Sequence, residues 1–393
     1  GRARLTIADV DGAGFDPTAW RHVWDDRAYV DGKGDGLWRR TLASARIGRI
    51  ALETDDTRMS ADRLVAGERS VRQFAEPLGR RVDRLMVDPD SVAPPDTLAL
   101  VLEDFLGSRH EGWAIEGFRL VGPGVERAEI ARFAVGPFSG ERLAEISLDG
   151  VDVAAGQTLL RLGRLALADL GLPDADDLRR GIPAAAAGAE IDPSSLMPTL
   201  GRLLVERLEV AEPGVPAIRL AGLRLEFDRW IRAVPTSLTL ALDHFVVPAG
   251  LADAEGRRTL AGLGYDRIDL SAAARLAWNE GTREITVDGA RLAIADAGAL
   301  DLSARLTGVP RSLFTRPDTA ALLLADIGLA EARATLTDAS FTERLVKLLA
   351  KDEKKKPERV RRRLADEIAG ELAAVRDPAR RRKAIAAIRR FIA

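Results

Sequence analysis

Apolar and polar residues alternate over much of the chain between residues 115 and 337, which is the spacing of a strand with one dry face and one wet face. Within residues 266–278 the apolar positions are Ile268, Leu270, Ala272, Ala274, Leu276 and Trp278. Residues 300–307 and 330–337 alternate in the same way, with Leu302 and Leu306 on the apolar side. Turn-forming residues separate these segments. The pattern predicts an antiparallel meander.

The alternation changes phase at several points. Ile218 and Leu220 are followed by a break at residues 221–222, after which Leu223 resumes the pattern, and Gly289 shifts the phase as a bulge does. The runs 146–153 and 285–292 share an Ile-x-apolar-Asp-Gly core. This echo favours a repeated unit, although any antiparallel sheet of this composition could produce it.

Residues 1–110 are predicted to be mixed but rich in helix. Asp16 and Pro17 form a helix start signal, with Trp20, Val23 and Trp24 following at helical spacing. Two further helices are expected over 60–76 and 96–105. The segment 171–198 is rich in Pro, Gly and Ala and reads as a connector, with a short helix after it that uses Leu200, Leu203 and Leu204.

The last part of the chain, 338–393, is predicted to be a basic helical tail. Ser340 and Glu343 have capping-box spacing, and a later stripe places Val360, Leu364 and Ile368 at intervals of four. The predicted fold is therefore α+β and β-rich, a long curved antiparallel meander over 111–337 between a helix-rich N-terminal region and a helical tail. The chain ends just after an apolar patch without a stop signal, as expected of part of a longer protein.

Charge separates the tail from the rest. The whole chain has a net charge of −2, which excludes a globally basic nucleic-acid binder. Residues 351–393 hold 15 Lys or Arg and 7 Asp or Glu, which leaves the preceding residues net acidic. We expect this tail to lie on an anionic membrane surface, to dock to an acidic partner, or to pack on the sheet with a solvated basic face. Nucleic acid is disfavoured because Phe391 is the tail's only aromatic residue.

Catalytic and metal-binding motifs are missing from the sequence. There is no cysteine, and the string Gly136-Pro-Phe-Ser139-Gly140 lacks the spacing of a nucleophile elbow. The loop from Asp31 to Gly36 lacks two ligand positions of a calcium loop. The three histidines are scattered, with His244 expected on the apolar phase of the strand ending at Leu242. We therefore expect a protein that is not an enzyme and that needs no cofactor or metal.

The meander resembles the repetitive strand pattern of AsmA-like and related uncharacterised proteobacterial envelope proteins. The residues that carry this resemblance are Gly262 to Asp266, leading into Ile268 and Leu270, and then Ile285 to Gly289. It covers residues 115–337 and rests on alternation. It implies a long curved sheet in the periplasm or cell envelope of a bacterium, with a role in lipid handling or outer-membrane upkeep. An acyl chain or an envelope protein is then the expected partner.

An apolar sheet face must be covered by helices, by a second sheet, or by a ligand in a groove. The leading hypothesis is a non-enzymatic envelope protein that binds an apolar ligand such as lipid, or another envelope component, on the curved sheet. Its candidate lining residues are Leu270, Leu276, Trp278, Leu302 and Leu306. The alternative is a structural or scaffolding module that binds a protein partner through its sheet edges or its basic tail. Ligand identity, oligomeric state and any preceding signal peptide or anchor stay open.

Overall fold

The protein is built on one long open sheet, and the computed structural model is mostly sheet (58%) with short helices among the described residues. It describes residues 3–31, 33–74, 77, 107–173, 177, 178, 181, 184, 197–316, 327–371, 379 and 382–387. The sheet has 14 antiparallel strands that follow one another in chain order and do not close. The predicted β-rich α+β fold with a long antiparallel meander is confirmed.

The strands of the long sheet, in spatial order, are β1 (Arg4–Ala13), β3 (Ser44–Glu53), β4 (Arg58–Ala66), β7 (Trp113–Gly122), β8 (Val125–Val135), β9 (Arg142–Ala155), β10 (Thr158–Gly171), β11 (Thr199–Glu212), β12 (Val215–Ile231), β13 (Val234–Pro248), β14 (Arg267–Asn279), β15 (Glu284–Ile294), β16 (Gly298–Thr307) and β17 (Gly328–Asp338). A second, small sheet joins β2 (Arg39–Leu42), β5 (Arg69–Val71) and β6 (Ser108–His110). The helices are α1 (Pro17–Trp24), α5 (Ala254–Leu263), α6 (Ser312–Thr315), α8 (Phe341–Asp352) and α9 (Pro357–Glu371).

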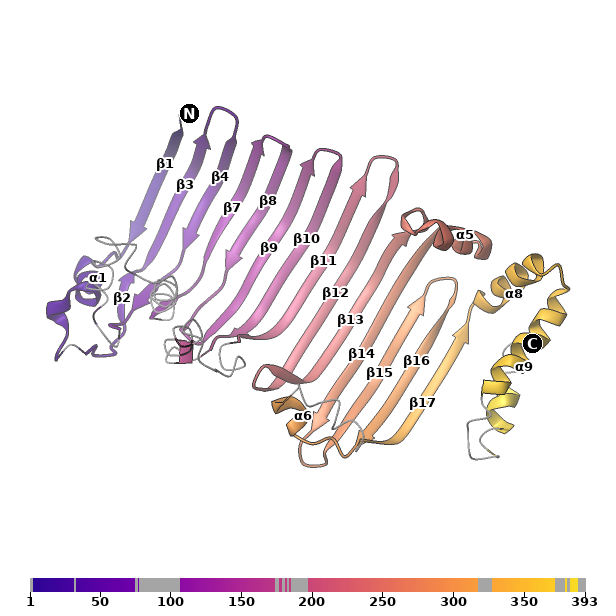
Figure 1. The fold of residues 1–393 in the computed structure, drawn as a ribbon. Coiled ribbons are helices and arrows are strands. Elements are labelled where there is room, and N and C mark those ends of the chain that lie inside the picture. Colours follow the sequence, from indigo (N-terminus) through magenta and orange to yellow (C-terminus); the bar gives the residue numbers. More distant parts are fainter. Residues whose placement is uncertain are drawn as a thin grey trace.

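The long sheet is a single layer in the part of the chain that is described. The helices lie along its rims and beyond its last strand, and none crosses its broad face in Figure 1. The chain exposes 24370 Å² of surface, whereas a compact monomer of this mass exposes about 15,000 Å² by the usual scaling with mass. Small hydrophobic clusters at the helices and strand ends, such as Val23 with Val71 and Phe74, replace a central core.

Two predicted helices are wrong. Residues 60–66 belong to β4 and residues 69–71 form β5, and residues 200–204 lie within β11. In β4, Ala61 and Leu64 lie on the same face of the sheet although they are three residues apart, because the strand carries one extra residue between them. Apolar residues three apart are also typical of a helix, which explains the wrong prediction. The helix expected over 96–105, and most of the connector at 171–198, lie outside the described residues. The helix start at Asp16 is confirmed, because its carboxylate accepts hydrogen bonds from the backbone N–H groups of Thr18 and Ala19.

A line of left-handed residues crosses the sheet from β1 to β13 and explains the phase breaks there. Five of these residues lie one on every second strand: Arg49 (φ 49°), Gly117 (φ 62°), Gly150 (φ 63°), Arg207 (φ 52°) and His244 (φ 48°). On β15 the left-handed Gly289 (φ 60°) is displaced along the strand, because the register shifts between β13 and β14 and again between β14 and β15. At this level the apolar residues of β9 and β10 are three apart instead of two. Leu148 faces Leu165 and Val151 faces Leu162. Each of these two strands has one extra residue at this point, Gly150 in β9 and Gly163 in β10. The extra residues lie opposite each other, so the backbone pairing of the two strands continues unchanged on both sides. We call this line the kink.

Candidate functional site: the apolar face of the sheet

A row of apolar side chains runs across the whole sheet, and from β1 to β13 it lies beside the kink. The backbone register connects its members strand by strand, with one residue on each of the 14 strands. We call it the apolar row: Val10, Ile47, Leu64, Ile115, Phe133, Leu148, Leu165, Val205, Leu223, Leu242, Ala272, Leu292, Leu300 and Leu336. With neighbouring strands about 4.8 Å apart, it is roughly 60 Å long.

A parallel row on the other side of the kink belongs to the same face. It links Val151, Leu162, Leu208 and Leu220 through direct register pairs and continues to Phe245, Leu270 and Ile294. The two rows together form a continuous band, which we call the apolar face. Globular monomers rarely expose an apolar patch this large unless it binds a ligand, a membrane or another protein.

The side chains of the apolar row are left half-buried or exposed. Every member from Ile47 to Ala272 is only half-buried, which is the shielding that neighbouring side chains on one sheet give each other. The ends are open, with Val10 at 72% and Leu336 at 57% exposure. Within the described ranges no helix or second sheet lies on the middle of the row (Figure 1).

The opposite face is polar and neutralises its own charge. Residues that directly follow or precede the apolar row form a second row of alternating charge: Arg63, Glu116, Arg132, Asp149, Arg164 and Glu206. Arg164 lies 3.1 Å from Asp149, and nearby Arg119 forms a two-pronged ion pair with Asp62 that lowers the pKa of the Asp62 carboxyl. Such a face is stable in water, whereas the apolar face is stabilised by contact with an apolar partner.

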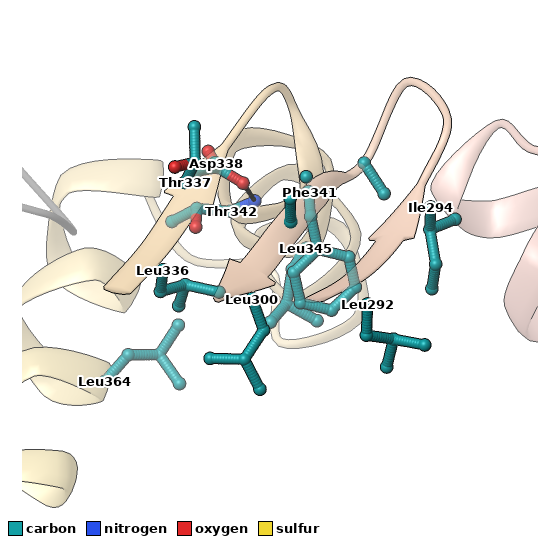
Figure 2. Close-up of a pocket in the computed structure, with 13 residues that line it drawn as sticks. Leu292, Ile294, Leu300, Leu336, Thr337, Asp338, Phe341, Thr342, Leu345 and Leu364 are labelled. Carbon is teal, nitrogen blue, oxygen red and sulfur yellow. Dashed lines mark hydrogen bonds between the residues drawn. The ribbon is translucent and has the colours of Figure 1, made fainter. Parts of the chain in front are cut away.

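The apolar row ends in a pocket. The pocket has a volume of about 460 Å³, is open to solvent on one side, and is lined by the ends of β15, β16 and β17 together with α8 and α9. Leu292, Leu300 and Leu336 of the row form its sheet side, and Leu345 and Leu364 come from the two helices (Figure 2). Its few polar groups lie at one side, where Asp338 accepts a hydrogen bond from the backbone N–H of Thr342.

The five lining residues expected from the sequence lie on the apolar face but in different surroundings. Leu270 and Leu276 are half-buried and Leu302 is 41% exposed, so all three are accessible. Trp278 is only 5% exposed and Leu306 packs in its cluster. The indole N–H of Trp278 donates a hydrogen bond of 3.2 Å to the carbonyl of Val309. Trp278, Val309 and Phe314 form a buried cluster where the end of β14 meets α6.

Sequence reasoning missed the pocket and placed His244 wrongly. Four leucines of the pocket occupy regular apolar positions of their own strand or helix: Leu300, Leu336, Leu345 and Leu364. The sequence does not show that the strands β16 and β17 lie next to the helices α8 and α9. His244 does not extend the apolar phase, because it occupies the kink and its Nδ1 atom lies 3.1 Å from Oδ1 of Asp269 on the polar side.

His110 is a half-buried histidine away from the apolar row. His110 stacks on Phe138, burial lowers the pKa of its imidazole, and its Nδ1 atom has no hydrogen-bond partner in the part of the chain that the structure describes. Among the described residues no cluster of three or more His, Asp or Glu residues could hold a metal ion. In the same ranges no helix has the length and hydropathy needed to cross a bilayer.

Comparison with known proteins adds one finding. Residues 291–393 match a family model described only as an uncharacterized protein. This range contains every residue that lines the pocket between the last strands and the helices α8 and α9. No curated protein and no solved structure matches the chain.

Proposed function

We propose that this protein binds the acyl chains of lipids along the apolar face and that the pocket beside α8 and α9 holds the end of an acyl chain. The observation that carries the proposal is the apolar row, which places an apolar side chain on each of 14 consecutive strands. Covering such side chains is favourable by about 25 cal/mol per Å² of apolar surface removed from water. A flexible apolar chain fits this face because the face offers contact area and few hydrogen-bonding groups.

The pocket supports an acyl chain rather than a polar small molecule. Its lining consists of five leucines, Ile294, Phe341, three small residues and two threonines, and Asp338 is the one charged residue among the described residues that line it. The carboxylate of Asp338 is already used in capping α8. Binding therefore needs no charged or strongly polar ligand group at this end of the row.

The proposal places the protein in the bacterial cell envelope as a non-enzymatic component. The support is the resemblance of residues 115–337 to AsmA-like strand repeats, for which an apolar sheet in the periplasm is expected. A solvated, self-neutralised polar face such as that of Arg164 and Asp149 agrees with an aqueous compartment on one side of the sheet.

A scaffolding role through the sheet edges is the second candidate. It is favoured by one observation, that every residue of the two edge strands β1 and β17 is exposed. Edge strands with unpaired backbone groups readily accept another strand. The two roles are compatible, because edge pairing uses backbone groups and lipid binding uses side chains of the broad face.

Native mass spectrometry of the protein purified from a bacterial lysate, followed by organic extraction, tests the lipid proposal. We expect bound lipid in the unaltered protein and its loss in Leu302→Asp, which puts a carboxylate on the apolar face. The matched control is Ser303→Asp, because residue 303 lies on the opposite face of the same strand. Lipid retained equally in both variants, or absent from the unaltered protein, contradicts the proposal, provided that circular dichroism shows folded sheet.

A further inference from the structure

The edge strand β1 presents an unpaired, apolar-faced edge. All ten of its residues are exposed, and its apolar side chains Leu5, Ile7 and Val10 are 63%, 45% and 72% exposed. Its only strand partner in the described residues is β3. The strand has neither proline nor lysine, two of the usual devices that block edge-to-edge pairing.

The kink of β1 lies at the centre of the strand, and this makes the edge complementary to itself. The kink falls at residues 8 and 9, between Ile7 and Val10 of the apolar face. Two copies of β1 related by a twofold axis perpendicular to the sheet can pair antiparallel with Ile7 opposite Val10 and Leu5 opposite Gly12. In this register the kinks of the two copies coincide and both apolar faces point to the same side. A shift by one residue would place apolar against polar positions.

Charge complementarity supports the same register. Thr6 then lies opposite Asp11, and Arg4 of each copy is the diagonal neighbour of Asp11 of the other, within reach of its long side chain. Neither Arg4 nor Asp11 forms an ion pair within the described part of its own chain, so both are available. The two Asp9 carboxylates come near the axis, but each is already neutralised by Arg49 at 3.0 Å.

The other edge does not have this property. In β17 the register irregularity is a bulge near one end, between Leu329 and Glu331, so a twofold pairing would bring the irregular points of the two copies out of line. The helices α8 and α9 also lie along the length of β17 on its outer side in Figure 1, whereas beside β1 the only described helix is α1, past one end of the strand. Closed twofold dimers are the commonest assemblies of identical chains.

We propose that β1 is a homodimer interface through which two copies join their sheets edge to edge, extending the apolar row from one copy into the next. The interface is formed by backbone pairing of one short strand, so we expect a concentration-dependent dimer rather than an obligate one. The inference rests on β1 alone and does not require that the apolar face binds lipid.

Disulfide trapping tests it, since the chain contains no cysteine. In the full chain carrying Ile7→Cys and Val10→Cys together, mild oxidation is expected to give a covalent dimer linked between positions 7 and 10. The two positions cannot bridge within one chain, because three residues along a strand span about 10 Å and a disulfide needs Cα atoms within about 7 Å. The control is Leu5→Cys with Val10→Cys, which lie on the same face but out of register.

Each outcome decides the question. A dimer that forms many-fold faster in the matched pair than in the control, with the 7-to-10 linkage found by peptide mapping, supports the proposal. A monomer at all concentrations with no matched cross-link overturns it, as do large assemblies joined through β17. Circular dichroism on each variant shows whether the sheet is intact, and the lipid content of the unaltered protein reports on the proposed function separately.

Discussion

The carboxylate of Asp62 on β4 lies directly against the Cα atom of Gly117 on β7. A β-carbon added at Gly117 would overlap the Cγ and Oδ2 atoms of Asp62, and Gly117 has a φ of 62°. Asp62 is held there by its two hydrogen bonds from Arg119, of 2.8 and 3.0 Å. The kink therefore depends on a glycine where a fixed carboxylate of the neighbouring strand passes.

Gly117→Ala is expected to destabilise the sheet more than the same change in a turn. Gly124 is the matched control, because it also has a positive φ, 74°, but open space around it. We expect Gly117→Ala to lower the free energy of unfolding by about 1 kcal/mol more than Gly124→Ala, because the added methyl group displaces the Asp62 carboxylate from its hydrogen bonds with Arg119. Chemical denaturation measures both. Equal losses would show that the kink does not need the contact.

Trp278→Ala is expected to cost about 3–5 kcal/mol of stability, as large-to-small changes of buried aromatic residues do. The indole packs on Phe314 with ring centroids 4.6 Å apart, and its N–H bonds to the carbonyl of Val309. Trp278→Phe keeps most of the packing and removes the hydrogen bond, so about 1 kcal/mol is expected. A small effect of the alanine variant in urea denaturation would contradict the placement of this residue in a closed cluster.

The loop around Asp35 is expected to lose stability in acid. Its ion pair with Arg39, 2.5 Å long, holds the pKa of the Asp35 carboxyl well below its usual range. A carboxyl with a lowered folded pKa stabilises the protein above its unfolded pKa of about 3.9 and loses this contribution as pH falls through the folded value.

Thermal unfolding between neutral pH and about pH 2 should show this loss in the unaltered protein and a smaller loss in Asp35→Asn, because the unfolded pKa sets the onset near 4. Identical pH profiles of the two proteins would show that the ion pair with Arg39 contributes nothing measurable to folding.

Filling the pocket is expected to weaken acyl-chain binding without loss of folding. Leu300 lines the pocket and is 38% exposed, so Leu300→Trp has room to place its ring there. Leu329→Trp is the control, since residue 329 is 63% exposed on the same face of the sheet and does not line the pocket. Titration with a fluorescent fatty acid should give a higher Kd for Leu300→Trp alone. An unchanged Kd in both variants would place binding elsewhere.

Much of the long sheet was predictable because its strands keep an apolar period of two. Leu270, Leu276 and Leu302 were placed on the correct face from alternation alone. The kink was harder to interpret, since an extra residue turns the spacing of two into a spacing of three, and β4 was mistaken for a helix for this reason. The alignment of the kink across neighbouring strands depends on register, which a single sequence does not specify.

The pocket was beyond sequence reasoning for a different physical reason. Leu292 and Leu364 are more than 70 residues apart in the chain, and each has an ordinary place in its own amphipathic element. Only the packing of α8 on α9, through Val346 and Val360, and their position beside β17 bring these residues to one cavity. Trp278 was a reasonable candidate from its phase but lies under α6.

Photo-cross-linking with a diazirine fatty acid tests the central claim most directly, because it reports which side chains an acyl chain contacts. After irradiation, peptide mapping is expected to find labels on the apolar face, at positions such as Leu242, Leu292 and Leu300. Few labels are expected on Asp243 or Arg291, which are next to Leu242 and Leu292 in the sequence but do not point to the apolar face. Labels spread equally over both faces, or confined to the outer surfaces of α8 and α9, would contradict a lipid-binding sheet.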